Sequence, residues 1–280
     1  MVGPTIGSLN IIADENIKYI VEQEEDIFER TYKYADINIT YLPELDMINR
    51  FMVDSVKSIM TTRPLTQEEL DYFDQRQSHP RQFAFATGAI AFIMQKNPKD
   101  TAFTYEEMIS MFKDGAKGKL FVIENAKSGI TQEILRLVDT TSLPKHFYAL
   151  ESKKDVFDYV LTHENAIGIV DWSDISDSDS MGGKELLNSI NLLGISRPLD
   201  SVQAGFIRPY QYNLQDHKYP FTRELYFISN TGKSDVGIGF ASFITGEIGQ
   251  KIILKSGLLP KYQTERVLEL KISPDIKVIK

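Results

Sequence analysis

Short runs of aliphatic and β-branched residues alternate along the chain with longer segments whose apolar residues recur at helical spacing. The first strand-like run covers residues 8–13, and Ile20, Ile27 and Phe28 then share one face of an expected helix. Further strand-like runs are expected at 36–42, 57–62, 119–124, 146–152, 166–172 and 224–230. Strands that alternate with helices of about 10–15 residues are typical of βαβ units with mainly parallel sheets.

Two of the expected helices begin with a capping box. Thr66 is followed three residues later by Glu69, and Thr104 is followed in the same way by Glu107. In this motif each side chain accepts a hydrogen bond from the other residue's free backbone N–H group. The pattern therefore predicts helix starts after Thr66 and Thr104, and Ser152 is expected to cap a third helix.

Three segments show a less regular pattern. Residues 82–95 are long and apolar, and Gly88 is expected to interrupt them. Residues 173–185 are polar and glycine-rich, which favours a loop. Residues 236–257 are apolar and punctuated by glycines, which indicates a helix or a pair of helices.

Composition places the chain among globular proteins of one large domain or two lobes. It has 280 residues, of which 42% are hydrophobic and 25% are charged. The net charge of -8 argues against nucleic acid as a partner, because nucleic-acid binders usually carry basic patches. The absence of cysteine excludes disulfides and cysteine-ligated metals, and no apolar run approaches the length of a membrane span.

Three turns between a strand and a helix are candidates for ligand binding. They are residues 14–16, 61–63 and 125–131. In open α/β sheets, ligands bind beyond the carboxyl ends of the strands, where helix N-termini expose unpaired N–H groups. Simple capping of its own helix is the alternative for each turn taken alone, whereas three such turns together favour an anion site between the halves of the molecule.

The side chains in these turns suit an oxyanion. Ser128 and Thr131 offer hydroxyl groups, and Gly129 allows a ligand to approach the backbone. Arg63 adds a planar guanidinium with five donors, although an ordinary surface ion pair is the alternative for this residue.

Catalytic and metal-binding patterns are missing from the sequence. The four histidines lie far apart, and neither a phosphate loop nor a nucleophile elbow is present. The acidic string Asp174, Asp177 and Asp179 lacks the glycine and the distal glutamate of a calcium loop, so a solvated loop is expected. We therefore expect no catalytic residues, no metal and no cofactor, and a hydrolytic enzyme is disfavoured.

Four long segments together resemble the phosphate ABC transporter substrate-binding proteins, in particular the version common in the Bacteroidetes. The resemblance spans nearly the whole chain in order. It is carried by "IMTTRPLTQEELDYF" (59–73), "GAIAFIMQKNPKDTAFTYEEMISMF" (88–112), "LPKHFYALESKKDVFDYVLTHENAIGIVDW" (143–172), and "YPFTRELYFISN" with "GIGFASFITGEIGQKIILKSGLLP" (219–230 and 237–260).

The resemblance implies a type II periplasmic-binding-protein fold, α/β, in which two lobes with mainly parallel sheets are joined by two crossover strands. The crossovers are expected near 85–93 and 223–228. Lobe 1 then comprises residues 1–88 and 226–280, and lobe 2 comprises residues 89–225. Such proteins are exported to the periplasm and many are lipid-anchored. They capture inorganic phosphate as monomers and deliver it to the permease of an ABC importer.

The family's phosphate-binding turns match positions of this sequence. The resulting expected ligand-binding residues are Asp14, Glu15, Asn16, Thr62, Arg63, Asn125, Ser128, Gly129 and Thr131.

Several positions depart from the family pattern. Asn16 stands where a hydroxyl residue is common, Gly88 replaces an aspartate, and Ile130 replaces a threonine. Glu124 stands where many relatives carry arginine. A different small oxyanion is therefore an alternative ligand, and a sensor or interaction protein without a transport role is an alternative function. If phosphate binds, Asp14 is expected to accept its proton and so exclude sulfate, with Glu124 as the alternative acceptor.

Overall fold

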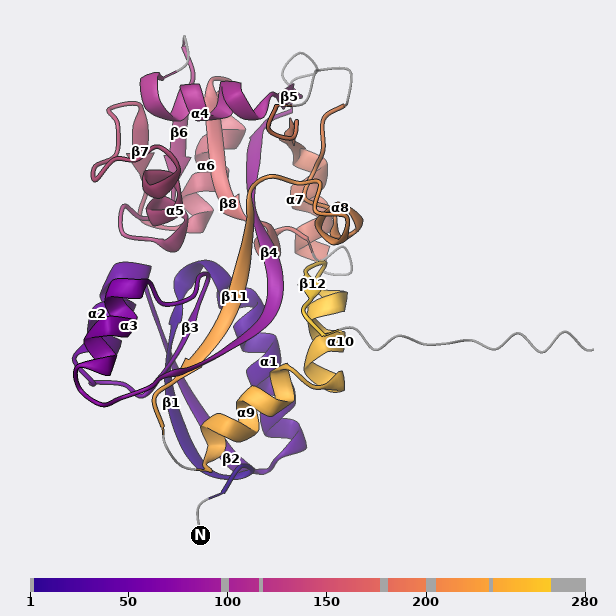
Figure 1. The fold of residues 1–280 in the computed structure, drawn as a ribbon. Helices are drawn as coiled ribbons and strands as arrows, with labels where there is room; N and C mark the ends of the chain where they lie inside the picture. Colours follow the sequence, from indigo (N-terminus) through magenta and orange to yellow (C-terminus); the bar gives the residue numbers. More distant parts are fainter. Residues whose placement is uncertain are drawn as a thin grey trace, which may run out of the picture.

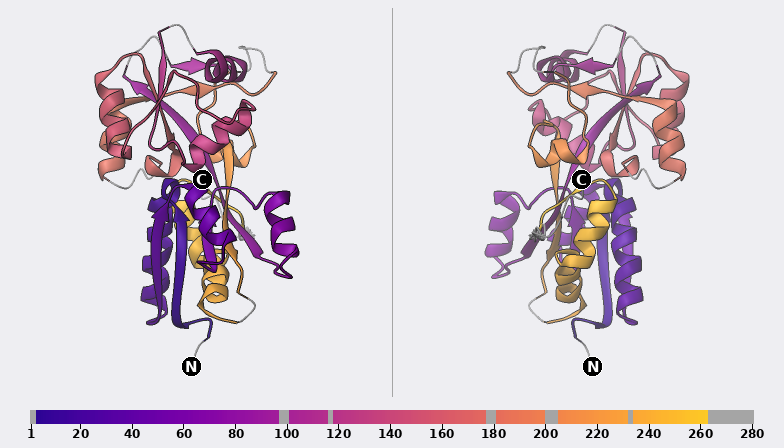
Figure 2. Two further views of the ribbon diagram at one scale, coloured as in Figure 1. Left: turned by 90° about the vertical axis from the view of Figure 1, so that its left-hand side faces the viewer. Right: turned by 90° about the vertical axis from the view of Figure 1, so that its right-hand side faces the viewer.

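The chain folds into two α/β lobes that lie end to end and are joined by two long strands (Figure 1). The computed structural model describes residues 3–96, 101–115, 118–176, 181–199, 205–231 and 234–262. Figure 2 shows the same two groups of elements from both sides, with the N-terminus at the far end of the first lobe.

The first lobe is built from both ends of the described chain, because the last helices return to pack beside the first ones (Figure 1). Its elements are β1 (Ile6–Asp14), η1 (Glu15–Ile17), α1 (Lys18–Thr31), β2 (Tyr34–Leu42), α2 (Glu44–Met52), β3 (Ser58–Thr61), α3 (Gln67–Asp74), α9 (Val236–Ile244), α10 (Glu247–Lys255) and β12 (Leu259–Pro260).

The second lobe is formed by the middle of the chain (Figure 1). Its elements are β5 (Ala102–Phe103), α4 (Tyr105–Asp114), β6 (Leu120–Ile123), α5 (Gly129–Leu137), β7 (Phe147–Ala149), α6 (Lys153–Thr162), β8 (Ala166–Asp171), η2 (Trp172–Asp174), α7 (Met181–Ser189), β9 (Ile190–Leu192), β10 (Gly194–Ile195) and α8 (Gln211–Gln215).

The two long strands, β4 (Arg81–Gln95) and β11 (Thr222–Ser229), join the lobes into one continuous sheet. Its main path runs in the order β2-β1-β3-β11-β4-β8-β6-β7. The strands of each lobe pair in parallel, β1 with β2 and β3, and β6 with β7 and β8. The pairs made by the joining strands are antiparallel. The expected α/β fold with two crossover strands is confirmed.

A bulge marks the middle of the crossover. The register of β11 against β4 shifts between Leu225 and Tyr226, so that Phe85 has no partner in the ladder. Its carbonyl oxygen instead accepts hydrogen bonds from the side-chain amide of Gln250 at 2.9 Å and from the N–H of Lys261 at 3.1 Å. Because bulges bend a strand, this position is where β4 changes direction between the lobes.

Two details of the sequence interpretation were wrong. Gly88 does not interrupt its segment, because β4 runs unbroken through it. A Cβ atom at Gly88 would lie 3.1 Å from a methyl carbon of Leu225, so close packing explains the glycine. The segment 173–185 is not all loop, since η2 includes Ser173 and α7 begins at Met181; residues 177–180 lie outside the described part.

The predicted helix starts are confirmed. Glu69 N–H donates to Thr66 Oγ1 at 3.3 Å and Thr66 N–H donates to Glu69 Oε2 at 2.8 Å, which completes the capping box. The same pair of bonds joins Thr104 and Glu107 at the start of α4. The glycine-rich segment near the C-terminal end forms two helices, α9 and α10.

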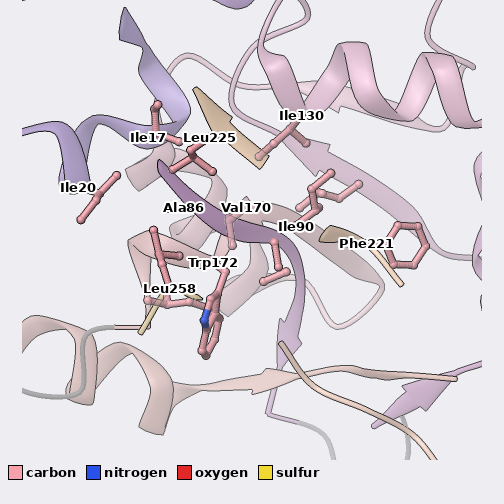
Figure 3. Close-up of a cluster of buried hydrophobic side chains, with 14 of the residues drawn as sticks. Ile17, Ile20, Ala86, Ile90, Ile130, Val170, Trp172, Phe221, Leu225 and Leu258 are labelled. Carbon is pink, nitrogen blue, oxygen red and sulfur yellow. The ribbon is translucent and has the colours of Figure 1, made fainter. Parts of the chain in front are cut away.

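A hydrophobic core extends from one lobe into the other around β4. Figure 3 shows Ile17 of the first lobe, Ile130 of the second lobe and Trp172 after β8 among the buried side chains that surround this strand. All three are at most 3% exposed. This packing brings the ends of β1, β3 and β6 to the lobe interface, where the candidate site lies.

Candidate functional site

The three predicted turns meet at Gly129, the first residue of α5. A Cβ atom built on Gly129 would lie 2.2 Å from Asp14 Oδ2 and 2.9 Å from Thr62 Oγ1. Asp14 ends β1 and Thr62 follows β3, so side chains of the first lobe touch the helix start of the second lobe. A larger residue would fit only if these side chains moved, because any Cβ would clash with both groups.

Asn16 connects the lobes by hydrogen bonds. Its Oδ1 accepts from the N–H of Ile130 at 3.0 Å, and its backbone oxygen accepts from Nζ of Lys153 at 3.3 Å. Asn16 is 1% exposed, and its own N–H donates to Asp14 Oδ1 at 2.9 Å. The amide group of Asn16 therefore satisfies a free N–H at the start of α5.

The residues of the third turn support its shape. Ser128 Oγ accepts from the N–H of Thr131 at 3.3 Å, and the Thr131 hydroxyl donates to the carbonyl oxygen of Asn125 at 2.6 Å. Asn125 Oδ1 accepts from the N–H of Lys127 at 2.9 Å. In the conformation described, these groups cap their own helix, which was the alternative considered for this turn.

Arg63 lies beside the site with its guanidinium bound to two carboxylates. Its Nε donates to Glu44 Oε1 at 2.9 Å, and its terminal nitrogens donate to the two oxygens of Glu69 at 2.8 Å each. A further bond joins Arg63 to the carbonyl oxygen of Pro64 at 2.8 Å. Burial by itself would lower the Arg63 pKa, but the bonds to Glu69 and Glu44 raise it, so the guanidinium stays charged.

Arg223 is a buried cation at this interface that the sequence reasoning missed. Its NH1 donates to Thr62 Oγ1 at 3.1 Å and its NH2 donates to Asp171 Oδ2, so β11 connects the ends of β3 and β8. Among the described residues its Nε has no hydrogen-bond partner, although the side chain is 2% exposed. The sequence did contain one indication of this role, because Arg223 is the only basic residue of a crossover strand that is otherwise mostly apolar.

Lys153 is the second cation that the sequence reasoning left unassigned. Its Nζ donates to Asp174 Oδ1 at 2.8 Å. Burial by itself would lower the Lys153 pKa, but Asp174 and Glu124 raise it. Burial raises the pKa of Asp174 to about 7, with Lys153 opposing this shift. The position of Lys153 at the first turn of α6 had suggested only a helix start.

Several carboxyl groups at the interface have pKa values above their ordinary range. Burial raises the pKa of Asp14 to about 7, Arg223 opposes the shift, and Glu44 adds to it. Burial also raises the pKa of Glu15, where Lys153 and Asn125 oppose it, and the pKa of Glu124. Asp14 can therefore offer a protonated carboxyl near neutral pH.

The space at the interface is small. A cavity of about 10 Å³ lies between the lobes, which is room for about one water molecule. It is lined by Asn16, Glu124, Ile130, Lys153, Val156, Ile169, Val170, Asp171 and Asp174. An oxyanion with several oxygens would thus enter only if the two lobes separated.

The described residues form neither a metal site nor a membrane-spanning helix. Across the described ranges, no group of three or more histidine or acidic side chains is arranged to hold a metal ion. Of the helices that the structure describes, none combines the length and the apolar character that crossing a bilayer requires.

Comparison with known proteins places this geometry in a family. A family model described as the PBP superfamily domain matches residues 2–247. A phosphate ABC transporter substrate-binding protein from Clostridium perfringens, solved with bound phosphate, is 18% identical with a TM-score of 0.73, covering 91% of this chain and 99% of its own. No protein of the curated set matches this chain significantly.

Two further solved structures are similar. An ABC-type phosphate transport receptor from Vibrio cholerae has 14% identity and a TM-score of 0.70, with 91% of this chain and 100% of that chain covered. The CcmR regulatory domain from Synechocystis, in complex with 2-PG, has 11% identity and a TM-score of 0.56, with 83% and 92% covered. At these identities the likeness shows a shared fold.

Proposed function

Because the chain belongs to the PBP superfamily, we propose that it is an extracytoplasmic solute-binding protein that captures inorganic phosphate between its lobes. The observation that carries the proposal is the meeting of three strand-to-helix turns at Gly129, where no side chain of the helix itself blocks the approach. Such a helix start attracts anions through its N–H groups and its dipole.

The lobes would hold phosphate by closing around it. On this proposal lobe 1 comprises residues 1–88 and 226–280, lobe 2 comprises residues 89–225, and β4 and β11 bend between them. Hinge closure of this kind occurs on the microsecond to millisecond scale. An open form would separate Asp14 and Thr62 from Gly129, and phosphate would take the space that opens.

Four of the predicted residues, together with Arg223, have specific roles in this proposal. Gly129 and Ser128 would present the start of α5, and Thr62 would hold a phosphate oxygen while Arg223 supplies a buried positive charge. In its ionised form, Asp14 would accept a hydrogen bond from the proton of a hydrogen phosphate. Sulfate is fully ionised at neutral pH and would meet an unmatched carboxylate, which disfavours it. The remaining predicted contacts are Glu15, Asn16, Arg63, Asn125 and Thr131.

The proposed physiological role follows from the family. The protein would act in the periplasm, there attached by a lipid, and would deliver phosphate as a monomer to the permease of an ABC importer. It would perform no catalysis and need no cofactor. Similar proteins include a substrate-binding protein and a transport receptor, which supports a binding role.

A second candidate is favoured by the charge of the interface. Carboxylates outnumber cations at the lobe interface, where the acidic residues are Asp14, Glu15, Glu44, Glu69, Glu124, Asp171 and Asp174 and the basic residues are Arg63, Arg136, Arg223 and Lys153. A sensor or interaction protein on the same scaffold, or a protein for a different small anion, would account for this excess.

Isothermal titration calorimetry with phosphate, sulfate and small carboxylates tests the proposed function. Phosphate at a hundredfold excess over its dissociation constant should also stabilise the protein by about 2.7 kcal/mol. Gly129→Ala should abolish the heat of binding, because the added methyl group fills the meeting point. Gly3→Ala is the matched control, since nothing lies within 4 Å of the Cβ that it adds.

Two results would contradict the proposal. If no anion produced heat with the unmodified protein, the binding role for small anions would be wrong. If Gly129→Ala bound phosphate as tightly as Gly3→Ala did, phosphate would bind elsewhere on the molecule.

A further inference from the structure

The side-chain carboxylate of Glu44 lies between two arginines, one from each lobe. It is the first residue of α2 and follows Pro43, and its side chain is 1% exposed. Its Oε1 accepts from Arg63 Nε at 2.9 Å in the first lobe and from Arg136 NH1 at 3.4 Å in the second lobe. A single anionic group of the protein therefore contacts cations on both sides of the interface.

The other oxygen of Glu44 points to the start of α5. A Cβ atom on Gly129 would lie 3.1 Å from Glu44 Oε2. This oxygen is buried and finds no hydrogen-bond partner within the described residues. Leaving a buried charged acceptor unpaired is costly, so the arrangement is not explained by stability of the fold alone. The carboxylate lies where a helix start favours an anion.

The next two residues of α2 also contact the second lobe. Leu45 N–H donates to the carbonyl oxygen of Lys127 at 3.5 Å, and Asp46 pairs with Nζ of Lys127 at 3.2 Å. We call Glu44, Leu45 and Asp46 the α2 latch. Its two outer contacts are long or exposed and contribute little each, so the buried carboxylate is its main part.

The partners of Arg63 show which contact an incoming anion could replace. Glu69 binds Arg63 through both oxygens and also completes the capping box of α3. Two parallel hydrogen bonds between an arginine and a carboxylate are stronger than a single one. Glu44 holds Arg63 by one bond from Nε. An anion would therefore gain a donor of Arg63 by displacing Glu44 rather than Glu69.

We propose that Glu44 is an internal carboxylate ligand of the lobe interface, which holds the lobes together and competes there with the anion that the protein binds. For the identity of that anion the proposal rests on the proposed function. Competition of this kind reduces the apparent affinity in proportion to the fraction of molecules in which the internal group is released. It also selects anions that bind strongly enough to displace a carboxylate.

The test compares Glu44→Gln with Glu133→Gln. Glu133 pairs with the same Arg136, at 2.8 Å, and is 30% exposed, so its variant removes an equal charge but keeps the Glu44 carboxylate and its bond to Arg63. Since the chain has no cysteine, spin labels can be attached at Val53→Cys and Tyr148→Cys, which are 70% and 50% exposed on opposite lobes. Double electron–electron resonance then measures the distance between the two spin labels in the absence of phosphate. Calorimetry measures the affinity for phosphate.

With Glu44→Gln we expect a longer inter-lobe distance in the absence of phosphate and a phosphate dissociation constant lowered by about tenfold, which corresponds to about 1.4 kcal/mol. Glu133→Gln should leave both close to the values of the unmodified protein. If Glu44→Gln folded poorly, Arg136→Gln would break the same contact at a position that is 42% exposed, and it too should lengthen the distance.

The outcomes separate this proposal from the proposed function. Unchanged distances in both Glu44→Gln and Arg136→Gln would overturn the latch, even if phosphate bound to every variant. Lengthened distances together with no phosphate binding by any variant would support the latch and contradict phosphate as the ligand. A longer distance with unchanged phosphate affinity would overturn the competition.

Discussion

Asp14→Asn separates the charge of the buried carboxyl at the end of β1 from the hydrogen bond that it makes. Asp14 Oδ1 accepts from the N–H of Asn16 at 2.9 Å, and its Oδ2 has no partner among the described residues. Asparagine caps a helix about as well as aspartate does, so the variant keeps this bond and removes only the titration. The difference in stability between the two proteins then reports the buried charge.

The size and sign of the difference follow from the pKa of Asp14. Burial raises it from the ordinary 3.8 to about 7. Well below pH 3.8 the carboxyl is protonated in both the folded and the unfolded chain, so the two proteins should be almost equally stable. Between pH 4 and 7 only the unfolded chain releases the proton, so the unmodified protein loses about 1.4 kcal/mol per pH unit. Above pH 7 the difference should remain constant, at about 4 kcal/mol in favour of Asp14→Asn.

Urea unfolding at half-unit steps from pH 4 to pH 8.5, without phosphate, measures this difference. Asp216→Asn is the control, because it makes the same substitution at an exposed position. Carboxyl groups that do not interact with Asp14 affect both proteins alike and cancel from the comparison. A stability difference that did not change with pH would refute the reasoning, since it would mean that Asp14 is ionised in the folded protein as it is in the unfolded chain.

The remaining predictions concern two other buried groups. Burial raises the pKa of Glu24 in α1 to about 9, so the stability of Glu24→Gln relative to the unmodified protein should rise by about 3 kcal/mol between pH 4.5 and 7 and continue to rise up to pH 9. The same unfolding series, extended to about pH 9.5, measures this difference, and a rise that ended near pH 7 would contradict this assignment. Arg223→Met should cost about 3–5 kcal/mol in urea unfolding, because it leaves Asp171 buried and unpaired, and Arg223→Met with Asp171→Asn should recover most of that loss. Failure of the double variant to recover stability would show that the pair is not what Arg223 contributes.

Local patterns were sufficient to predict most strands and helices and the starts of α3, α4 and α6, but they did not predict α7, α8 or the short strands β5, β9 and β10. The capping box at Thr66 involves residues three positions apart, so its bonds form wherever the backbone turns into a helix. The turns after β1, β3 and β6 were found for the same reason, because each follows an apolar run and precedes a helical one. The rule that parallel strands end at one edge then brought Asp14 and Gly129 together correctly.

The sequence by itself thus determined the elements, the two-lobed fold through its resemblance, and the turns that meet between the lobes. The tertiary structure decided which charges face one another there. Arg63 binds Glu44 and Glu69, and Arg223 binds Asp171, across separations that no spacing rule describes. The physical reason is that helix and strand periodicity acts between neighbours along the chain, whereas pairing and desolvation of charges depend on distances and burial that exist only after the lobes have packed.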